Sequence, residues 1–130
     1  MKFTKKAQKF SLLSRLRSFK FAFKGIFFLF KSEHNAWIHA LAAIVAISFG
    51  FYFKITQNEW IVVIFLIGFV FSAEAFNSAI EKLVDKISPE YNETAGHIKD
   101  LAAGAVLFAA IAAAIAGIVI FAPYFAKLVN

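Results

Sequence analysis

Five polar side chains recur on one side of a segment that is otherwise apolar enough to lie in a bilayer. They are Glu74, Asn77, Ser78, Glu81 and Asp85. At about 100° per residue, each falls within roughly 60° of Glu74 on an α-helix, so all five share one face. Ionisable groups in a membrane helix are rare and usually functional. The spacing therefore predicts a face that binds ions or takes part in catalysis.

The two glutamates of this face would do different chemistry because they lie at different depths. Glu81 is roughly 10 Å beyond Glu74 along the helix and closer to water. Carboxylates bind Mg²⁺ and hold it against phosphate oxygens, and the candidate ligands are Glu81 and Glu33. Glu74, partly desolvated at the lipid boundary, is suited to take a proton from an alcohol near neutral pH. The arrangement predicts phosphoryl transfer from a water-soluble donor to a lipid alcohol.

Further charges stand where the last apolar segment begins. Lys99 and Asp100 could place a cation near the phosphates and a further acid near the metal. The chain has no Walker lysine loop, no kinase glycine-rich loop and no Ser-His-Asp order, so a nucleotide would be bound in an unusual way. The histidines are scattered without zinc-site spacing, and none is assigned to catalysis: His34, His39 and His97.

The same residues also have structural interpretations. Glu74 could pair with a lysine of a neighbouring helix, and Asn77 could hydrogen-bond between helices. Asp85, Glu90 and Glu93 could form a solvated face. Taken alone, each residue is compatible with a role that is not catalytic.

A different class of function is a non-catalytic membrane subunit or a small ion pathway, in which inward acids line a pore. A pore needs polar positions along its whole depth. Residues 60–73 offer only Ser72, so the acids reach the membrane from one side only. This placement favours an enzyme over a pore.

The composition indicates an integral membrane protein. The chain has 130 residues, 61% of them hydrophobic, and a mean hydropathy of +0.72, which exceeds what a soluble core of this size could bury. It has no cysteine, so neither disulfides nor thiolate metal sites can hold it together. Packing in lipid must supply the stability.

The N-terminal part of the chain is strongly basic. Residues 1–31 hold nine Lys and Arg and no acid, which predicts a cytoplasmic N-terminus close to anionic headgroups. The alternative is a contact with nucleotide phosphates from Arg15, Arg17 or Lys24, while nucleic-acid binding is not expected beside so hydrophobic a body. No cleaved signal peptide is expected, because a long apolar stretch with a small-residue cleavage site is missing.

Hydrophobic periodicity predicts an all-α integral membrane protein with one domain over residues 1–130. An amphipathic helix in the membrane surface is followed by three transmembrane helices. Ser88-Pro89 ends the second span, residues 88–97 form a polar loop, and Pro123 closes the third span near the opposite surface. The predicted helices are 10–32 at the surface and 36–53, 59–87 and 98–122 across the membrane.

Together these motifs resemble the small prokaryotic diacylglycerol kinases, over nearly the whole chain after residue 10. The resemblance rests on A-E-A-F-N-S-A-I-E-K-L-V-D at 73–85, E-Y-N-E-T-A-G-H-I-K-D at 90–100, and the K-G…E-H-N…H stretch from Lys24 to His39. It implies an ATP- and Mg²⁺-dependent lipid kinase of the bacterial inner membrane. It also implies a homotrimer whose active sites are shared between neighbouring protomers.

The resemblance implies roles for individual residues by motif position. Glu74 looks like the catalytic base, and Glu33 and Glu81 look like the metal ligands. Asn77 and Ala103 fall close to the acceptor alcohol. The implied nucleotide contacts are Phe21, Glu33, Glu81, Glu90, Tyr91, Asn92, Lys99 and Asp100, and Arg15 is near the position of the family's N-terminal arginine.

Two stretches bear on the acceptor. E-H-N-A-W-I-H at 33–39 and K-D-L-A-A-G-A-V at 99–106 look more like the branch that phosphorylates undecaprenol. The diacylglycerol-specific branch usually has a serine where this chain has Ala103. Both alcohols, diacylglycerol and undecaprenol, remain candidate acceptors.

Overall fold

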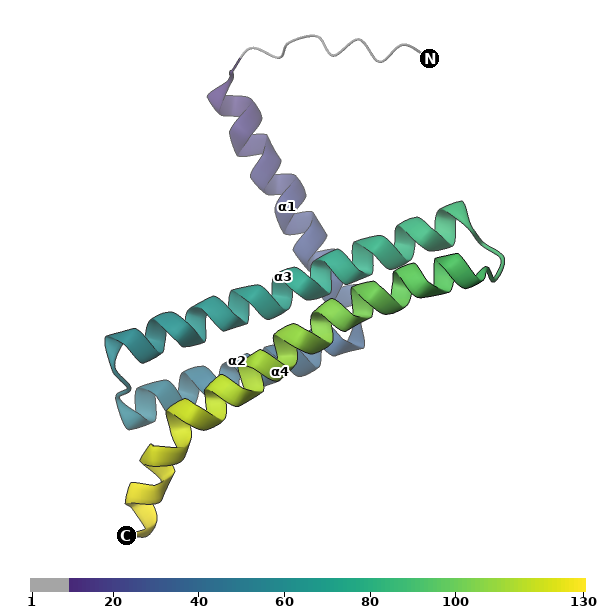
Figure 1. The fold of residues 1–130 in the computed structure, drawn as a ribbon. Helices are drawn as coiled ribbons and strands as arrows, with labels where there is room; N and C mark the ends of the chain where they lie inside the picture. Colours follow the sequence, from purple (N-terminus) through teal and green to yellow (C-terminus); the bar gives the residue numbers. More distant parts are fainter. Residues whose placement is uncertain (1–9) are drawn as a thin grey trace.

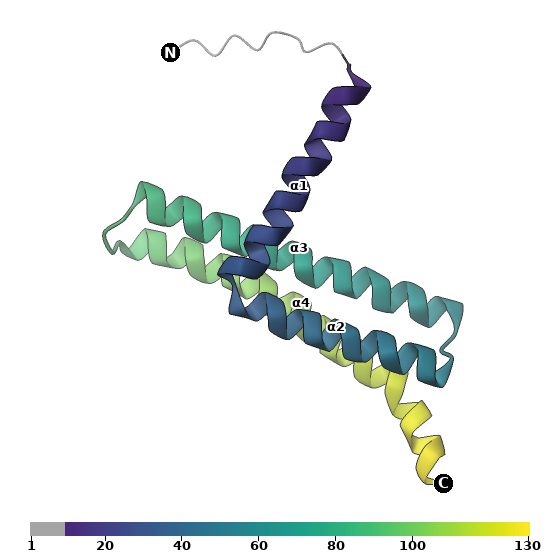
Figure 2. The same cartoon turned by 180° about the vertical axis from the view of Figure 1, so that it is seen from behind.

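The computed structural model describes residues 10–130, and this part of the chain folds into four α-helices (Figure 1). In Figures 1 and 2, α2, α3 and α4 run side by side, whereas α1 lies across them. The last three helices are each long and apolar enough to cross a membrane, so the predicted fold class is confirmed. Residues 1–9 of the basic arm lie outside the described residues. The helices are α1 (Leu12–Ser32), α2 (His34–Phe53), α3 (Gln57–Ile87) and α4 (Glu93–Val129).

The transverse helix α1 exposes almost all of its large apolar side chains. Ser11 caps its N-terminus by accepting a hydrogen bond from the Ser14 amide, and Leu29 is its one buried residue. Phe19, Phe23 and Phe27 stand out from the helix at four-residue intervals. Exposed aromatics interspersed with lysines suit a helix that lies in a membrane surface.

The end of the bundle that holds the α2–α3 turn is closely packed. Lys54 ends α2 in the left-handed conformation, with φ of 50°. A Cβ at Gly50 would lie 2.7 Å from the Trp60 ring, so only glycine allows this close approach of the two helices. Thr56 and Glu59 form a reciprocal capping box at the start of α3. Buried apolar side chains complete this end: Ile55, Val63, Ile120 and Phe121.

The structure corrects both predicted ends of the last helix. α4 begins at Glu93 rather than at residue 98, because the Asn92 side chain accepts hydrogen bonds from the amides of Thr94 and Ala95. The polar loop after α3 therefore ends at Asn92. α4 also continues through Pro123 to Val129, and Figure 1 shows its yellow C-terminal part bending away. Proline removes one hydrogen bond and crowds the preceding turn, so here it bends the helix instead of ending it.

Candidate active site

A sharp turn between α1 and α2 places Glu33 against α3. Glu33 has an extended backbone, with φ of −117°, and its amide donates to the Leu29 carbonyl. Trp37 holds the turn from the other side, because its indole N–H donates to the Phe30 carbonyl at 2.8 Å and the two rings pack edge to face. The chain direction changes within one residue, which lets the side chain of Glu33 reach the polar face of α3.

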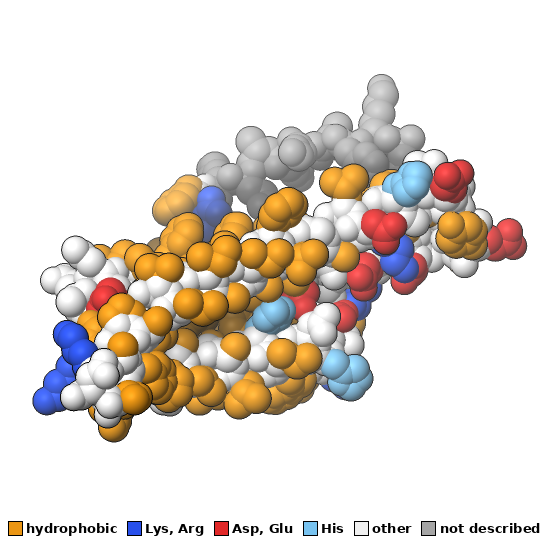
Figure 3. Space-filling model, turned by 60° about the horizontal axis from the view of Figure 1, so that its bottom comes forward, with side chains coloured by type: hydrophobic (Ala, Val, Ile, Leu, Met, Phe, Trp, Pro, Cys, Tyr) orange, Lys and Arg blue, Asp and Glu red, His pale blue; other side chains and the backbone are white. Residues whose placement is uncertain are grey.

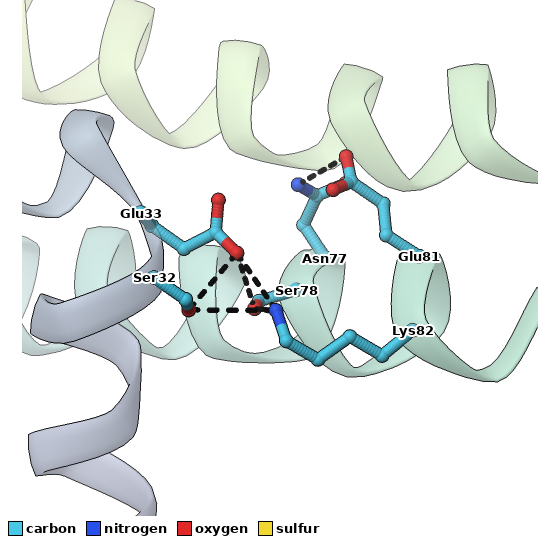
Figure 4. A network of polar contacts seen from close by, with 6 residues as sticks. All are labelled: Ser32, Glu33, Asn77, Ser78, Glu81 and Lys82. Atoms are coloured by element: carbon cyan, nitrogen blue, oxygen red, sulfur yellow. Dashed lines mark hydrogen bonds and ion pairs between the residues drawn. The ribbon is translucent and has the colours of Figure 1, made fainter. Parts of the chain in front are cut away.

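Three donors converge on one oxygen of Glu33 (Figure 4). Its Oε1 accepts from Ser78 Oγ at 2.8 Å, Lys82 Nζ at 2.9 Å and Ser32 Oγ at 3.2 Å. Lys82 Nζ also donates to Ser78 Oγ at 2.8 Å, so the donors are themselves linked. The hydrogen bonds from Lys82 and then Ser78 hold the pKa of Glu33 below its usual value. Glu33 is thus a stable anion at neutral pH.

Asn77 and Glu81 extend this cluster along α3. The Asn77 side-chain amide donates to Glu81 Oε1 at 3.1 Å, while its own Oδ1 is buried and has no hydrogen-bond partner within residues 10–130. In Figure 4, Glu33 and Glu81 project to the same side of α3 with Asn77 between them. The α1–α2 turn thus brings Glu33 toward the face of α3 that carries Asn77 and Glu81.

The oxygens in this region suit a hard divalent cation. Such ions prefer carboxylate and amide oxygens, and Mg²⁺ takes only one or two protein carboxylates alongside waters and phosphates. In the described part of the chain, Glu33 and Glu81 each accept hydrogen bonds at Oε1 and not at Oε2. Asn77 Oδ1 accepts none from these residues. No three acidic, histidine or cysteine side chains form a complete metal cage over residues 10–130. The donor set fits an ion that would be held jointly with phosphate.

Glu74 lies one helical turn before Ser78 and has very different surroundings. It is only 2% exposed, and its Oε1 is buried without a hydrogen-bond partner among the described residues. His39 Nε2 on α2 lies 3.5 Å from that oxygen. His39 also lines an apolar groove of about 590 Å³ between α2, α3 and α4. Glu74 therefore stands where the polar cluster meets the apolar interior.

Most of the predicted nucleotide residues lie between the end of α3 and the start of α4, apart from Phe21 on α1 and Glu33 in the α1–α2 turn. Lys99 Nζ donates to Asp85 Oδ1 at 2.8 Å, which ties the two helices together. Asn92 uses its side chain to cap α4. The remaining members of the predicted set are exposed: Phe21 on α1, Glu90 and Tyr91 in the loop, and Asp100 and the acceptor candidate Ala103 on α4. The described chain gathers Glu33, Asn77 and Glu81, whereas these other groups lie exposed on three different segments.

Charged and apolar side chains are segregated on the surface. Figure 3 shows hydrophobic side chains over most of the visible face, with lysines and acids at both ends and the larger group of acids toward the right. The polar cluster thus lies to one side of a hydrophobic body, as expected for a site at a membrane boundary.

Two residues of the site escape prediction from the sequence. Lys82 neighbours Glu81 but points to Glu33, because the α1–α2 turn brings that acid to its side of α3. His39 is a polar residue in an otherwise apolar span. Its depth in α2 is similar to that of Glu74 in α3, and this similarity could have indicated their contact. Both contacts depend on helix packing rather than on spacing along one helix.

Known proteins with similar sequences identify the family of this chain. Residues 20–121 match the sequence model of the family described as prokaryotic diacylglycerol kinase. An undecaprenol kinase from Bacillus subtilis (strain 168) is 39% identical over 107 residues, which are 82% of this chain and 87% of the relative. A diacylglycerol kinase from Synechocystis sp. is 35% identical over 103 residues, 78% of this chain and 59% of the relative. A diacylglycerol kinase from Escherichia coli (strain K12) is 31% identical over 99 residues, 71% of this chain and 81% of the relative. The chain therefore belongs to the prokaryotic diacylglycerol kinase family and is a multi-pass membrane protein and an ATP-dependent lipid kinase.

Proposed function

We propose that this kinase transfers the γ-phosphate of ATP directly to the hydroxyl group of a membrane lipid alcohol, with Glu74 as the general base. The observation that carries the proposal is the buried Glu74 carboxyl, which has no hydrogen bond among the described residues and lies one helical turn from an oxygen-rich cluster. A general base needs lone pairs that are available to a substrate proton. The Glu74 carboxyl meets that need.

The reaction divides between the two ends of the polar face. Glu81 lies roughly 10 Å further along α3 than Glu74, so ATP would approach from the water side and the alcohol from the lipid side. Glu74 takes the hydroxyl proton as the alcohol oxygen bonds to the γ-phosphorus. The bond from that phosphorus to the β–γ bridging oxygen breaks, and ADP leaves with the electron pair. Catalysis in such transfers is mostly positioning and charge stabilisation.

Glu33 and Glu81 are the residues that would hold Mg²⁺, beside the unpaired Asn77 Oδ1. When bound, the ion supplies positive charge that neutralises the phosphate oxygens. Glu33 suits this task because its donors keep it anionic. Asn77, between the two acids, is also well placed to orient the acceptor close to Glu74.

The nucleotide would be bound at the open end of α3 and α4. The proposed contacts extend from the Asp85-bound Lys99 to the exposed side chains of the loop and of α1. We propose a homotrimer in the bacterial inner membrane with a cytoplasmic N-terminus, in which neighbouring protomers complete each site. Broad apolar exposure on α2, α3 and α4 leaves room for such partners. The proposed nucleotide contacts are Phe21, Glu33, Glu81, Glu90, Tyr91, Asn92, Lys99 and Asp100.

We propose two candidate acceptors. The stretches at 33–39 and 99–106, together with the identity to the Bacillus subtilis undecaprenol kinase, favour undecaprenol. The diacylglycerol kinases among the relatives keep diacylglycerol as the second candidate.

The test is phosphate transfer from labelled ATP in mixed micelles that contain either diacylglycerol or undecaprenol. Transfer to undecaprenol alone would assign the kinase to the supply of a lipid carrier, and transfer to diacylglycerol alone would assign it to phospholipid recycling. No transfer to either alcohol by folded protein would reject both acceptors. Full activity of a folded Glu74→Gln protein would reject Glu74 as the base.

A further inference from the structure

The buried Glu74 carboxyl faces a potential hydrogen-bond donor on α2, the side chain of His39. Burying a carboxylate oxygen without a donor costs free energy, so native proteins seldom leave one unpaired. Glu74 Oε1 is in this condition, and His39 Nε2 lies 3.5 Å away. Closing that gap by a few tenths of an ångström gives a hydrogen bond of normal length.

The start of α2, which carries His39, is anchored to the end of α1. His39 lies about one and a half turns after Glu33 on α2, and the Trp37 contacts with Phe30 anchor the start of that helix. Its side chain is 19% exposed, compared with 3% for that of Glu74. The imidazole thus sits at the rim of the buried site and spans from α2 to α3.

We propose that His39 is a positioning residue that donates a hydrogen bond from Nε2 to Glu74 Oε1 and thereby turns Oε2 toward the acceptor hydroxyl. The inference rests on the proposed role of Glu74 as the base. During transfer the hydroxyl proton moves to Glu74 Oε2, the alcohol oxygen bonds to the γ-phosphorus, and ADP leaves. His39 neither gains nor loses a proton in this step. Its task is to select one orientation of the carboxyl group.

The inference explains why a polar residue occurs in an apolar span. His39 lines the apolar groove among alanines, valine and phenylalanines, where an aliphatic residue would pack without desolvation cost. A histidine in this place is useful if its ring reaches a polar partner. Glu74 is the acidic partner within ion-pair distance in the described chain.

Two substitutions at this position separate positioning from packing. His39→Leu removes the donor and keeps apolar bulk, whereas His39→Gln keeps an N–H donor near the place of Nε2. We expect His39→Leu to lower kcat about tenfold or more with KM for ATP within about twofold, since the lost interaction concerns the base and not the nucleotide. His39→Gln should recover kcat to within about threefold of the native value. The matched control is His34→Leu, because His34 is exposed and makes no side-chain hydrogen bond among the described residues.

A double substitution tests whether His39 acts through Glu74. In a Glu74→Gln background, His39→Leu should change the residual rate by less than about twofold, because the group that it positions is already gone. All variants are first compared by size-exclusion chromatography in detergent and by thermal unfolding.

Several outcomes would overturn the inference. One is a native kcat for His39→Leu. Another is that His39→Leu and His39→Gln lose the same amount of kcat and the same amount of thermal stability. The third is that the kcat losses of His39→Leu and Glu74→Gln multiply in the double variant. If Glu74→Gln itself keeps full activity, the proposed base is wrong, whatever His39 does. If Glu74→Gln is inactive and His39→Leu is fully active, the proposed function stands and only the role of His39 is rejected.

Discussion

Glu33 and Glu74 are two carboxylates of one polar region, and their surroundings are opposite. Glu33 is partly exposed and accepts hydrogen bonds from Ser32, Ser78 and Lys82 at one oxygen. Glu74 is almost fully buried, and its Oε1 has no hydrogen bond within residues 10–130. Donors stabilise an anion and suit it to hold a cation, whereas missing donors leave lone pairs for a substrate proton. The two glutamates thus have different proposed roles because of their surroundings, although their residue type is the same.

The largest expected effect comes from removing the unpartnered carboxylate. Glu74→Gln keeps size and shape but loses the base, so kcat should fall by about 10²- to 10⁴-fold while KM for ATP changes little. Initial rates in mixed micelles measure both parameters. Glu59→Gln is the matched control, because this other glutamate of α3 accepts hydrogen bonds from Tyr124 and Thr56 at the opposite end of the bundle. A comparable loss in both variants would mean that the substitution acts through the helix and not through the chemistry.

A smaller effect with a different signature is expected at Glu33, the proposed metal ligand. Glu33→Gln should lower the rate about tenfold at low Mg²⁺, because one anionic ligand for the ion is lost. Raising Mg²⁺ should restore part of the rate in Glu33→Gln but none in Glu74→Gln. Magnesium titrations of the two variants at saturating ATP provide the measurement. If excess Mg²⁺ rescues both variants or neither, the proposed division between the two glutamates is wrong.

The polar face of α3 was predictable from the sequence because the geometry of a single helix determines it. Positions 74, 77, 78, 81 and 85 share a face wherever the helix lies, since the repeat is 3.6 residues per turn. The end of α3 was equally accessible, because Ser88-Pro89 blocks continuation. These predictions need no knowledge of how the helices pack.

The partners across helices were not predictable by the same means. The contact of Lys82 with Glu33 and that of His39 with Glu74 both depend on the one-residue turn after α1. Periodicity sets which face a residue occupies but not which residue of another helix it meets. The ends of α4 also departed from expectation, because a side-chain cap at Asn92 and a tolerated bend at Pro123 are local events that hydropathy does not record.

The smallest expected effect concerns Lys82, whose ammonium group pairs with Glu33. Lys82 Nζ is 2.9 Å from Glu33 Oε1, and both side chains are partly exposed. Because a bound cation must share this carboxyl with Lys82, Lys82→Met should tighten Mg²⁺ binding by about two- to fivefold, in line with the up to ~1 kcal/mol typical of exposed ion pairs. Titration with Mg²⁺ in the absence of ATP measures this directly. Weaker binding would instead show that Lys82 orders Glu33 for the metal.

The effect of the same substitution on stability should depend on pH in one direction. The Lys82 and Ser78 hydrogen bonds lower the pKa of folded Glu33 below its unfolded value. Their stabilisation is therefore fully present above the unfolded pKa and is lost as the pH falls through the folded one. Lys82→Met should thus reduce thermal stability slightly at neutral pH, and the difference should vanish in acid once Glu33 is protonated. Thermal unfolding of both proteins in the same detergent at neutral and acidic pH checks this. A difference that persisted in acid would assign the contribution of Lys82 to its packing over the Phe28 ring, 5.1 Å from Nζ, instead of to its charge on Glu33.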